Sequence, residues 1–208
     1  MKGSFKPEWL RAYTLAEAAH AILTGRDLDA YITARPLLLD RQDLPFDEKL
    51  RVLDFGCGMG RCLMNGGQTR PYWEFIGYDN RVMLDRIPQI WPNQLPNVTY
   101  TDDWDVIKTG GLRGGIDIVY AELVLQHLQI EHLHQYLVDF NTFLRASPSE
   151  HASLIVHGRR TLDDGKTNLW PIVLEYFDDL ASAAVPPERL IDGNPNDHFM
   201  VRFVPKDL

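Results

Sequence analysis

Cysteine is scarce in this chain: Cys57 and Cys62 are the only two among its 208 residues. Two thiols cannot form a disulfide framework, and their C-x4-C spacing matches no zinc-binding motif. We therefore expect no metal site. We also expect a reducing compartment, the cytoplasm, as the location of the protein.

Long apolar runs and an excess of positive charge are also missing. No stretch reaches the roughly 20 apolar residues of a membrane-spanning helix. Glu17 and His20 interrupt the apolar N-terminal segment, so we expect neither a membrane span nor a signal peptide. The 21 basic and 29 acidic residues give a net charge of −8. This charge disfavours nucleic acid as a partner, although the adjacent pair Arg159 and Arg160 leaves a local basic patch open.

The residues that are present are typical of a globular protein, with 45% hydrophobic and 24% charged side chains. The length suits a single domain that spans the whole chain. We expect residues 1–45 to form a helical cap or lid. Apolar residues recur every three or four positions between Pro7 and Gly25, and a second short helix fits between Asp27 and Pro36.

From residue 50 to residue 208 the pattern changes to apolar strands that alternate with helical segments. The predicted strands cover residues 51–55, 73–79, 97–101, 116–121 and 153–158, and the clearest helix covers residues 131–145. Alternation of this kind indicates an α/β fold, in which a doubly wound, mostly parallel sheet carries helices on both faces.

The C-terminal segment departs from this alternation. We predict a helix from Asn168 to about Ala184, followed by two apolar runs, 188–192 and 198–204, on either side of the loop Gly-Asn-Pro-Asn-Asp. A polar loop between two apolar runs is typical of a hairpin, so the last strand should run antiparallel to its neighbours.

The segment VLDFGCGMGR, residues 52–61, holds the most informative pattern. An apolar strand carries an acid, Asp54, and then leads into the glycines of a G-x-G-x-G turn, Gly56, Gly58 and Gly60. Glycines permit positive φ and a close approach of a ligand to the backbone, and open α/β sheets bind ligands where their strands end. Such a turn suits a dinucleotide, a phosphate or an adenosyl ligand.

Two residues narrow this choice. Arg61 occupies the position where the dinucleotide motif G-x-G-x-x-G needs its last glycine. Asp54 would repel a pyrophosphate, whereas it would pair with a ligand that carries an ammonium group. We infer an adenosyl ligand with an amino-acid tail, S-adenosylmethionine.

This segment resembles the first motif of the class I S-adenosylmethionine-dependent methyltransferases, and later segments resemble their other motifs in order. The resemblance implies a seven-stranded, Rossmann-like sheet of order 3-2-1-4-5-7-6 with an antiparallel last strand. It also implies a set of cofactor-binding residues: Asp54, Gly56, Cys57, Gly58, Gly60, Arg61, Asp79, Asn80, Asp102, Asp103, Trp104 and Glu122.

Within that set, the resemblance implies that Asp79 binds the ribose hydroxyls. It also implies that Asp102 or Asp103 contacts the adenine, and Asp103 is favoured. Other roles stay open. Asp54 could pair with an arginine, Asp79 could form a turn, and either of the other two acids could cap the next helix. Trp104 could stack on adenine or lie buried in the core.

Two of the three catalytic candidates are histidines. The resemblance places His127 where the family has a histidine, which serves as a structural cap or as a base, and His157 ends the fifth strand on the expected substrate side. Glu122 is a third candidate. Tyr13 and Tyr31 could reach the substrate or the sulfonium.

We therefore predict an S-adenosylmethionine-dependent methyltransferase that acts on a small molecule by in-line methyl transfer. The segment AELV on the fourth strand lacks the D/N-P-P-Y/F tetrapeptide of enzymes that methylate nucleic-acid bases. An RNA or protein methyltransferase and a non-catalytic cofactor-binding protein stay open as alternatives. Asp54 and Arg61 oppose a nicotinamide dehydrogenase. The oligomeric state is not indicated by the sequence.

Overall fold

The computed structural model describes residues 35–125, 128, 130–159, 181–184 and 198–205. The chain divides into two compact units, Met1–Ile107 and Lys108–Leu208. The two helices predicted before Pro36 lie outside the described residues. Within the described part of the chain, no helix is long and apolar enough to cross a membrane.

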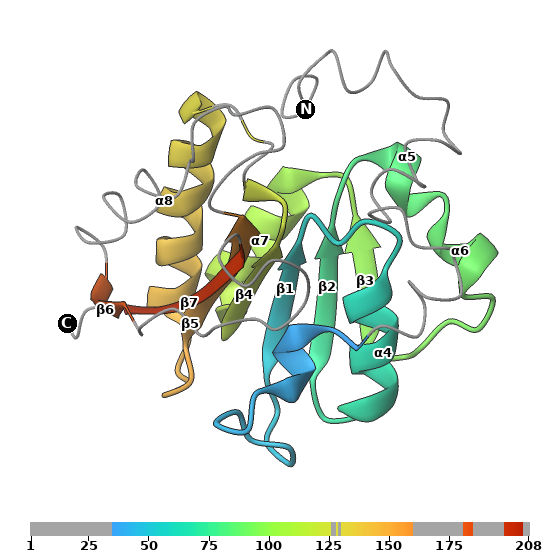
Figure 1. The fold of residues 1–208 in the computed structure, drawn as a ribbon, viewed down its shortest axis with the longest axis horizontal. Coiled ribbons are helices and arrows are strands. Elements are labelled where there is room, and N and C mark those ends of the chain that lie inside the picture. The colour runs from blue at the N-terminus through green and yellow to red at the C-terminus, as the bar shows by residue number, and fades with distance from the viewer. Residues whose placement is uncertain (1–34, 126–127, 129, 160–180, 185–197, 206–208) are drawn as a thin grey trace. The chain divides into compact units, whose positions relative to one another are not determined.

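The first unit is built on three parallel strands in the order β3-β2-β1 (Figure 1). They are β1 (Arg51–Phe55), β2 (Glu74–Tyr78) and β3 (Val98–Thr101), close to the predicted positions. Phe55 lies opposite Tyr78, and Tyr78 lies opposite Thr101. The three strands therefore end at the same level, and the segments that follow them lie along one edge of the sheet.

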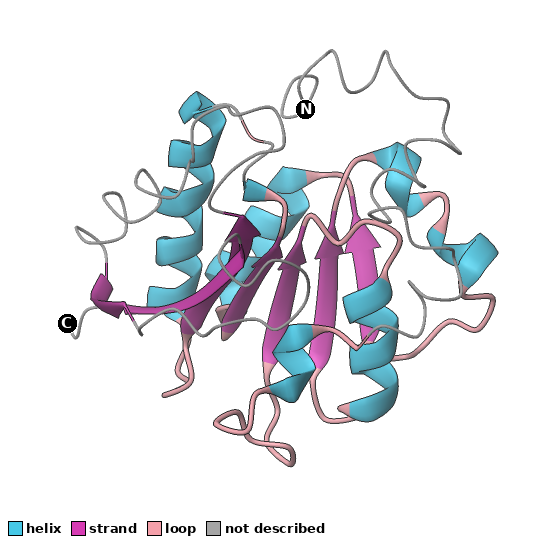
Figure 2. Cartoon of the chain, viewed as in Figure 1, coloured by secondary structure: helices cyan, strands magenta, loops and turns pink. Residues whose placement is uncertain are grey.

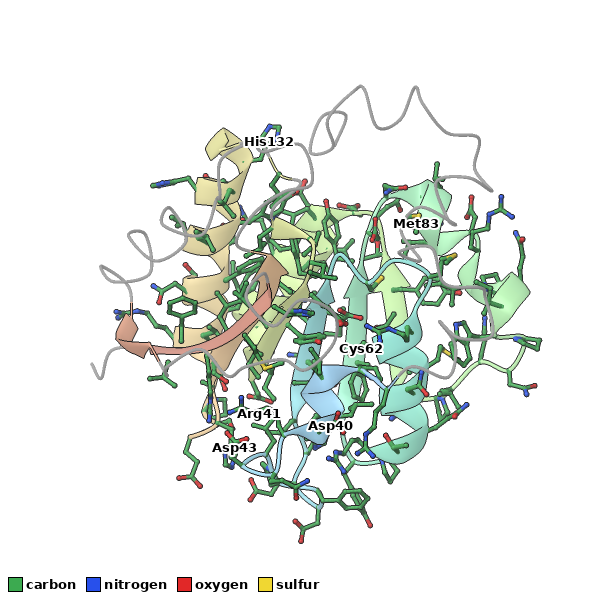
Figure 3. All side chains as sticks on the ribbon, viewed as in Figure 1. Asp40, Arg41, Asp43, Cys62, Met83 and His132 are labelled. Carbon is green, nitrogen blue, oxygen red and sulfur yellow. The ribbon has the colours of Figure 1, made fainter. Side chains whose placement is uncertain are left out.

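Short helices follow these strands (Figure 2). Between residues 35 and 107 the helical elements of the first unit are η1 (Leu37–Asp40), α4 (Arg61–Thr69), α5 (Arg81–Leu84), α6 (Ile87–Ile90) and the start of α7 (Trp104–Gly114). Cys62 on α4 and Met83 on α5 are both buried, and both are labelled in Figure 3. The two cysteines of the chain form no disulfide with each other, and both are buried. On the loop after η1, the guanidinium of Arg41 donates to the carboxylate of Asp43 at 2.8 and 2.9 Å.

Helix α4 contains two adjacent glycines, Gly66 and Gly67. The adjacent glycines Gly66 and Gly67 suggest that the helix after the glycine turn ends early, yet α4 continues through both of them to Thr69. A Cβ at Gly66 would lie at most 2.9 Å from three ring atoms of Phe75, and one at Gly67 would overlap with Val98. The glycines are needed because α4 lies too close to the sheet for any side chain.

The second unit carries the strands β4 (Ile118–Glu122), β5 (Ser153–Arg159), β6 (Ala181–Ala184) and β7 (His198–Pro205), with the helix α8 (Ile130–Ala146). Its strand order is β4-β5-β7-β6. Strand β4 pairs with β5 in parallel, whereas β7 pairs antiparallel with both β5 and β6. An α/β fold with mostly parallel strands and an antiparallel C-terminal strand is therefore confirmed.

The predicted helix from Asn168 to about Ala184 is wrong over its last residues, because Ala181–Ala184 form β6. The sequence Ala-Ser-Ala-Ala has a high intrinsic helix propensity, but backbone pairing with β7 overrides it. Residues 168–180 and the apolar run 188–192 lie outside the described residues.

Helix α8 shows the expected amphipathic pattern. Its buried apolar side chains are Leu133, Tyr136, Leu137, Phe140, Phe143 and Leu144. Spacings of three and four residues put these side chains on one face of the helix. Gly111 on α7 allows close packing here, because a Cβ at that position would lie 2.7 Å from Cδ1 of Phe143.

Candidate functional site

The turn after β1 requires its three glycines. Gly56, Gly58 and Gly60 have φ angles of 74°, 56° and 81°, which lie in the left-handed region that other residues rarely adopt. The N–H groups of Gly56 and Cys57 both donate to the carbonyl of Tyr78, at 2.8 and 3.1 Å. The turn is therefore fastened to the end of the neighbouring strand β2.

The turn is held at its far side as well. Gly60 is the N-terminal cap of α4, which begins at Arg61. A Cβ at Gly60 would lie 3.3 Å from the side chain of Ile87 on α6. The indole N–H of Trp91 donates to the carbonyl of Met59 at 3.0 Å. Side chains of α6 and of the residue that follows it thus close against the turn.

Asp79 links the end of β2 to the turn. The N–H of Gly58 donates to Oδ2 of Asp79 at 2.8 Å. The backbone N–H and the side-chain amide of Asn80 donate to Oδ1 at 2.7 and 2.8 Å. Burial raises the pKa of Asp79 to about 6, although these hydrogen bonds favour the charged form and oppose the shift. The carboxyl group therefore titrates close to neutral pH.

Asp54 lies on β1, one residue before the strand ends, and its side chain is buried. The negative charge of Asp54 acts on the turn, because it contributes to the raised pKa of the Cys57 thiol. Burial is the main cause that raises the pKa of Cys57, followed by the negative charges of Asp79 and then Asp54. The turn therefore lies in the field of two buried carboxylates.

Asp102 and Asp103 follow β3 and have different partners. The guanidinium of Arg81 donates to both carboxylate oxygens of Asp102, at 2.5 and 3.2 Å. Asp103 is exposed, and its Oδ1 accepts the N–H of Asp105 at the start of α7. Asp103 thus has the capping geometry that the sequence left open as an alternative. The contact of either acid with adenine stays a prediction.

Trp104 is buried at the start of α7. Its ring meets Tyr78 edge-on with 4.8 Å between the ring centroids, and it meets Phe55 edge-on at 5.6 Å. These three rings form one cluster where β1 and β2 end. The structure places Trp104 in the core, and stacking on a ligand stays a prediction.

The second unit brings together two of the predicted residues, Glu122 and His157. Glu122 is the last residue of β4, and His157 lies opposite it, two residues before the end of β5. Nδ1 of His157 is 3.4 Å from Oε1 of Glu122, and both side chains are largely buried. His127, Tyr13 and Tyr31 lie outside the described residues.

Two features of these regions were missed in the sequence. Arg81, which holds Asp102, is one charged residue among many, but its position directly after Asp79-Asn80 could have drawn attention to it. Leu123 has a φ of 54°, and it is the one residue other than glycine with positive φ among the described residues. Nothing in its sequence context signals this conformation, because leucine rarely adopts it.

No protein-family profile matches this chain, and no curated protein matches it in sequence. Solved structures do resemble it. A TehB-like S-adenosylmethionine-dependent methyltransferase from Corynebacterium glutamicum superposes with a TM-score of 0.58 and 17% identity, over 97% of this chain and 100% of that one. The magnesium protoporphyrin IX methyltransferase from Synechocystis, with S-adenosylmethionine bound, gives a TM-score of 0.56 and 15% identity, over 92% and 82%.

The N-methyltransferase NodS from Bradyrhizobium japonicum, in complex with S-adenosylhomocysteine, gives a TM-score of 0.55 and 13% identity, over 86% of this chain and 97% of that one. These neighbours share the class I type of structure that the sequence motifs resemble. The chain therefore has the fold of the class I S-adenosylmethionine-dependent methyltransferases.

Proposed function

We propose that this protein is an S-adenosylmethionine-dependent methyltransferase that acts on a small-molecule acceptor in the cytoplasm. One observation carries the proposal: a turn of three positive-φ glycines lies in the field of two buried acids, Asp54 and Asp79. The solved neighbours with S-adenosylmethionine or S-adenosylhomocysteine bound support the same cofactor.

The chemistry of the donor set fits this ligand. Two buried negative charges attract the ammonium of an aminoacyl tail and repel a pyrophosphate, which opposes a dinucleotide. The positive-φ backbone of Gly56, Gly58 and Gly60 leaves no Cβ between the turn and a ligand. When bound, S-adenosylmethionine supplies a methyl group on a positively charged sulfur.

Each residue has a defined part in the proposal. Asp54 holds the aminoacyl end, and the turn, with Cys57 and Arg61, lines it. Asp79 and Asn80 hold the ribose, while Asp102 or Asp103, together with Trp104, lies at the adenine. We also propose that the strands form one seven-stranded sheet of order 3-2-1-4-5-7-6 and that residues 1–45 form a cap or lid.

A small molecule is the favoured acceptor. The net charge of −8 disfavours a nucleic-acid backbone, and the neighbour that methylates magnesium protoporphyrin IX supports a small acceptor. Salt-sensitive binding of RNA to the purified protein would favour an RNA methyltransferase instead. A protein that binds the cofactor but transfers no methyl group by itself would favour the non-catalytic alternative.

Calorimetric titration of the full chain tests the cofactor. We expect S-adenosylmethionine and S-adenosylhomocysteine to bind, because both carry the ammonium and ribose groups that the two acids would recognise. NAD⁺ should give no heat, because its pyrophosphate meets the same acids. Binding of NAD⁺, or no binding of either adenosyl compound, would refute the proposal.

Binding should also depend on pH through Asp79. Ribose hydroxyls donate hydrogen bonds, so they require the ionised carboxylate, which loses its charge as the pH falls through about 6. We expect affinity for S-adenosylhomocysteine to be about tenfold weaker at pH 5 than at pH 7, measured by calorimetry. In the Asp79→Asn variant binding should be weak and nearly constant over this range. Equal wild-type affinity at both pH values would contradict the assignment.

A further inference from the structure

Arg81 connects the segments that follow two neighbouring strands, β2 and β3. It is the first residue of α5, and its guanidinium donates to both carboxylate oxygens of Asp102: Nη2 to Oδ1 at 2.5 Å and Nε to Oδ2 at 3.2 Å. Asp102 directly follows the last residue of β3. Two N–H groups on two oxygens is the geometry in which arginine binds a carboxylate best. Both residues belong to the first unit, as does the glycine turn.

The backbone that carries Arg81 is anchored. Oδ1 of Asn80 accepts the N–H of Met83 at 3.2 Å and so caps α5. Met83, labelled in Figure 3, and Leu84 are both buried. The guanidinium therefore extends from a fixed turn to Asp102, and the segment after β3 is tied to that turn.

The start of α5 is also connected to the glycine turn. The side-chain amide of Asn80 donates to Oδ1 of Asp79, whose Oδ2 accepts the N–H of Gly58. Strands β2 and β3 end in register, so the segments that follow them start side by side at the edge of the sheet where Figure 1 shows α5. A continuous series of contacts thus runs from Gly58 to Asp102. It spans the proposed ribose end and the proposed adenine end of the ligand site.

The next residue, Asp103, has different partners. Its N–H donates to Oγ1 of Thr101 at 3.0 Å, and its Oδ1 accepts the N–H of Asp105 at 2.9 Å. From the part of the chain that the structure describes, Oδ2 of Asp103 accepts no hydrogen bond. Of the two adjacent acids, Asp102 therefore faces a guanidinium, whereas Asp103 keeps one carboxylate oxygen for a donor on a ligand.

We infer that Arg81 is a positioning residue that decides which acid recognises the adenine. By pairing with Asp102 it compensates the charge of that acid and fixes the segment after β3, so that Oδ2 of Asp103 accepts the exocyclic amino group of the adenine. The inference rests on the proposed function. It adds the residue that sets the preference for adenine over a base that carries an oxygen in place of the amino group.

The pair is too exposed to serve mainly in folding. The side chains of Arg81 and Asp102 are 63% and 34% exposed, and exposed ion pairs contribute little to stability because water and salt screen them. A second acid, Asp85, lies 4.0 Å from Arg81 and is also exposed. Loss of Arg81 should therefore change ligand recognition while the melting temperature stays nearly constant.

Calorimetric titration of the full chain with two ligands tests this role. The ligands are S-adenosylhomocysteine and its inosine analogue, in which an oxygen replaces the amino group of the base. The wild-type protein should bind the adenosine compound at least about tenfold more tightly, because the analogue presents an acceptor to the carboxylate where adenosine presents a donor. Asp103→Asn should reduce this preference to about twofold, because an amide can accept from one compound and donate to the other.

The variants of the pair form a double-mutant cycle. Arg81→Ala and Asp102→Asn should each lower the preference about three- to fivefold, and the double variant should lower it no further, because both changes remove the same pair. Arg81→Lys should restore part of the preference, since an ammonium still compensates the charge of Asp102. Asp85→Asn is the matched control: it removes the other acid near Arg81 and should leave the preference unchanged.

An undiminished preference in Arg81→Ala would overturn the inference and leave the proposed function intact. Equal wild-type affinity for the two ligands would do the same, as would a preference that is lost in Asp102→Asn but kept in Asp103→Asn. Failure of the wild-type protein to bind S-adenosylhomocysteine would instead count against the proposed function itself.

Discussion

Replacing Asp54 with asparagine is expected to weaken binding of S-adenosylmethionine by about a hundredfold. Asparagine keeps the shape of the side chain and removes its charge. Asp54 is 3% exposed, so water screens its charge weakly. A hydrogen bond to a charged group contributes about 1.5 to 3 kcal/mol, and the loss of one such bond to the ammonium accounts for a hundredfold change, which corresponds to about 2.7 kcal/mol.

Calorimetry on Asp54→Asn and Asp139→Asn separates binding from folding. Asp139 is another buried acid, paired with Lys108 in the second unit. Its replacement should lower the melting temperature but leave the affinity for S-adenosylmethionine within about twofold of the wild type. If Asp54→Asn bound as tightly as the wild-type protein, Asp54 would have no part in recognition of the ligand.

Replacing Gly66 with alanine is expected to destabilise the protein by about 2 kcal/mol. The new Cβ would lie at most 2.9 Å from three ring atoms of Phe75. That ring is fully buried and packs beside Trp73, with 5.9 Å between the centroids, so it has little room to move. Overpacking of this kind costs about 1 to 3 kcal/mol, which exceeds the gain of up to about 1 kcal/mol in helix propensity.

Gly110→Ala is the matched control for this change. Gly110 also lies inside a helix, α7, but a Cβ there would meet no atom within 4 Å. We expect this variant to gain about 0.5 to 1 kcal/mol from propensity alone. Urea denaturation followed by circular dichroism gives both free energies. A Gly66→Ala protein as stable as Gly110→Ala would show that α4 does not need a glycine to approach the sheet.

Much of the fold could be predicted from the sequence because its signals are local. Each of the strands β1 to β5 lies within two residues of its predicted limits. The errors arise where contacts distant in sequence decide the outcome. Gly66 and Gly67 stay helical because Phe75 and Val98 need the space, and Ala181–Ala184 form a strand because β7 pairs with them.

The candidate site also combines features that local sequence patterns predict with contacts that they do not predict. The glycine turn and the acid before it follow from spacing; the three glycines have positive φ and Asp54 is buried, while their contact with a ligand stays a prediction. The ion pair of Arg81 with Asp102 joins residues that are 21 apart in sequence. No local sequence pattern predicts such a contact. The left-handed Leu123 was equally unpredictable, because its conformation depends on the carbonyl of a different strand.

The glycine turn is already ordered by bonds within the protein. The carbonyl of Tyr78 accepts two of its N–H groups, and the carboxylate of Asp79 accepts a third. The entropic cost of ordering the turn therefore falls on folding, and ligand binding should add little to it. We therefore expect calorimetric titration at several temperatures to give a heat-capacity change that the surface buried by the ligand accounts for. A binding reaction that also folds part of the chain would give a larger heat-capacity change.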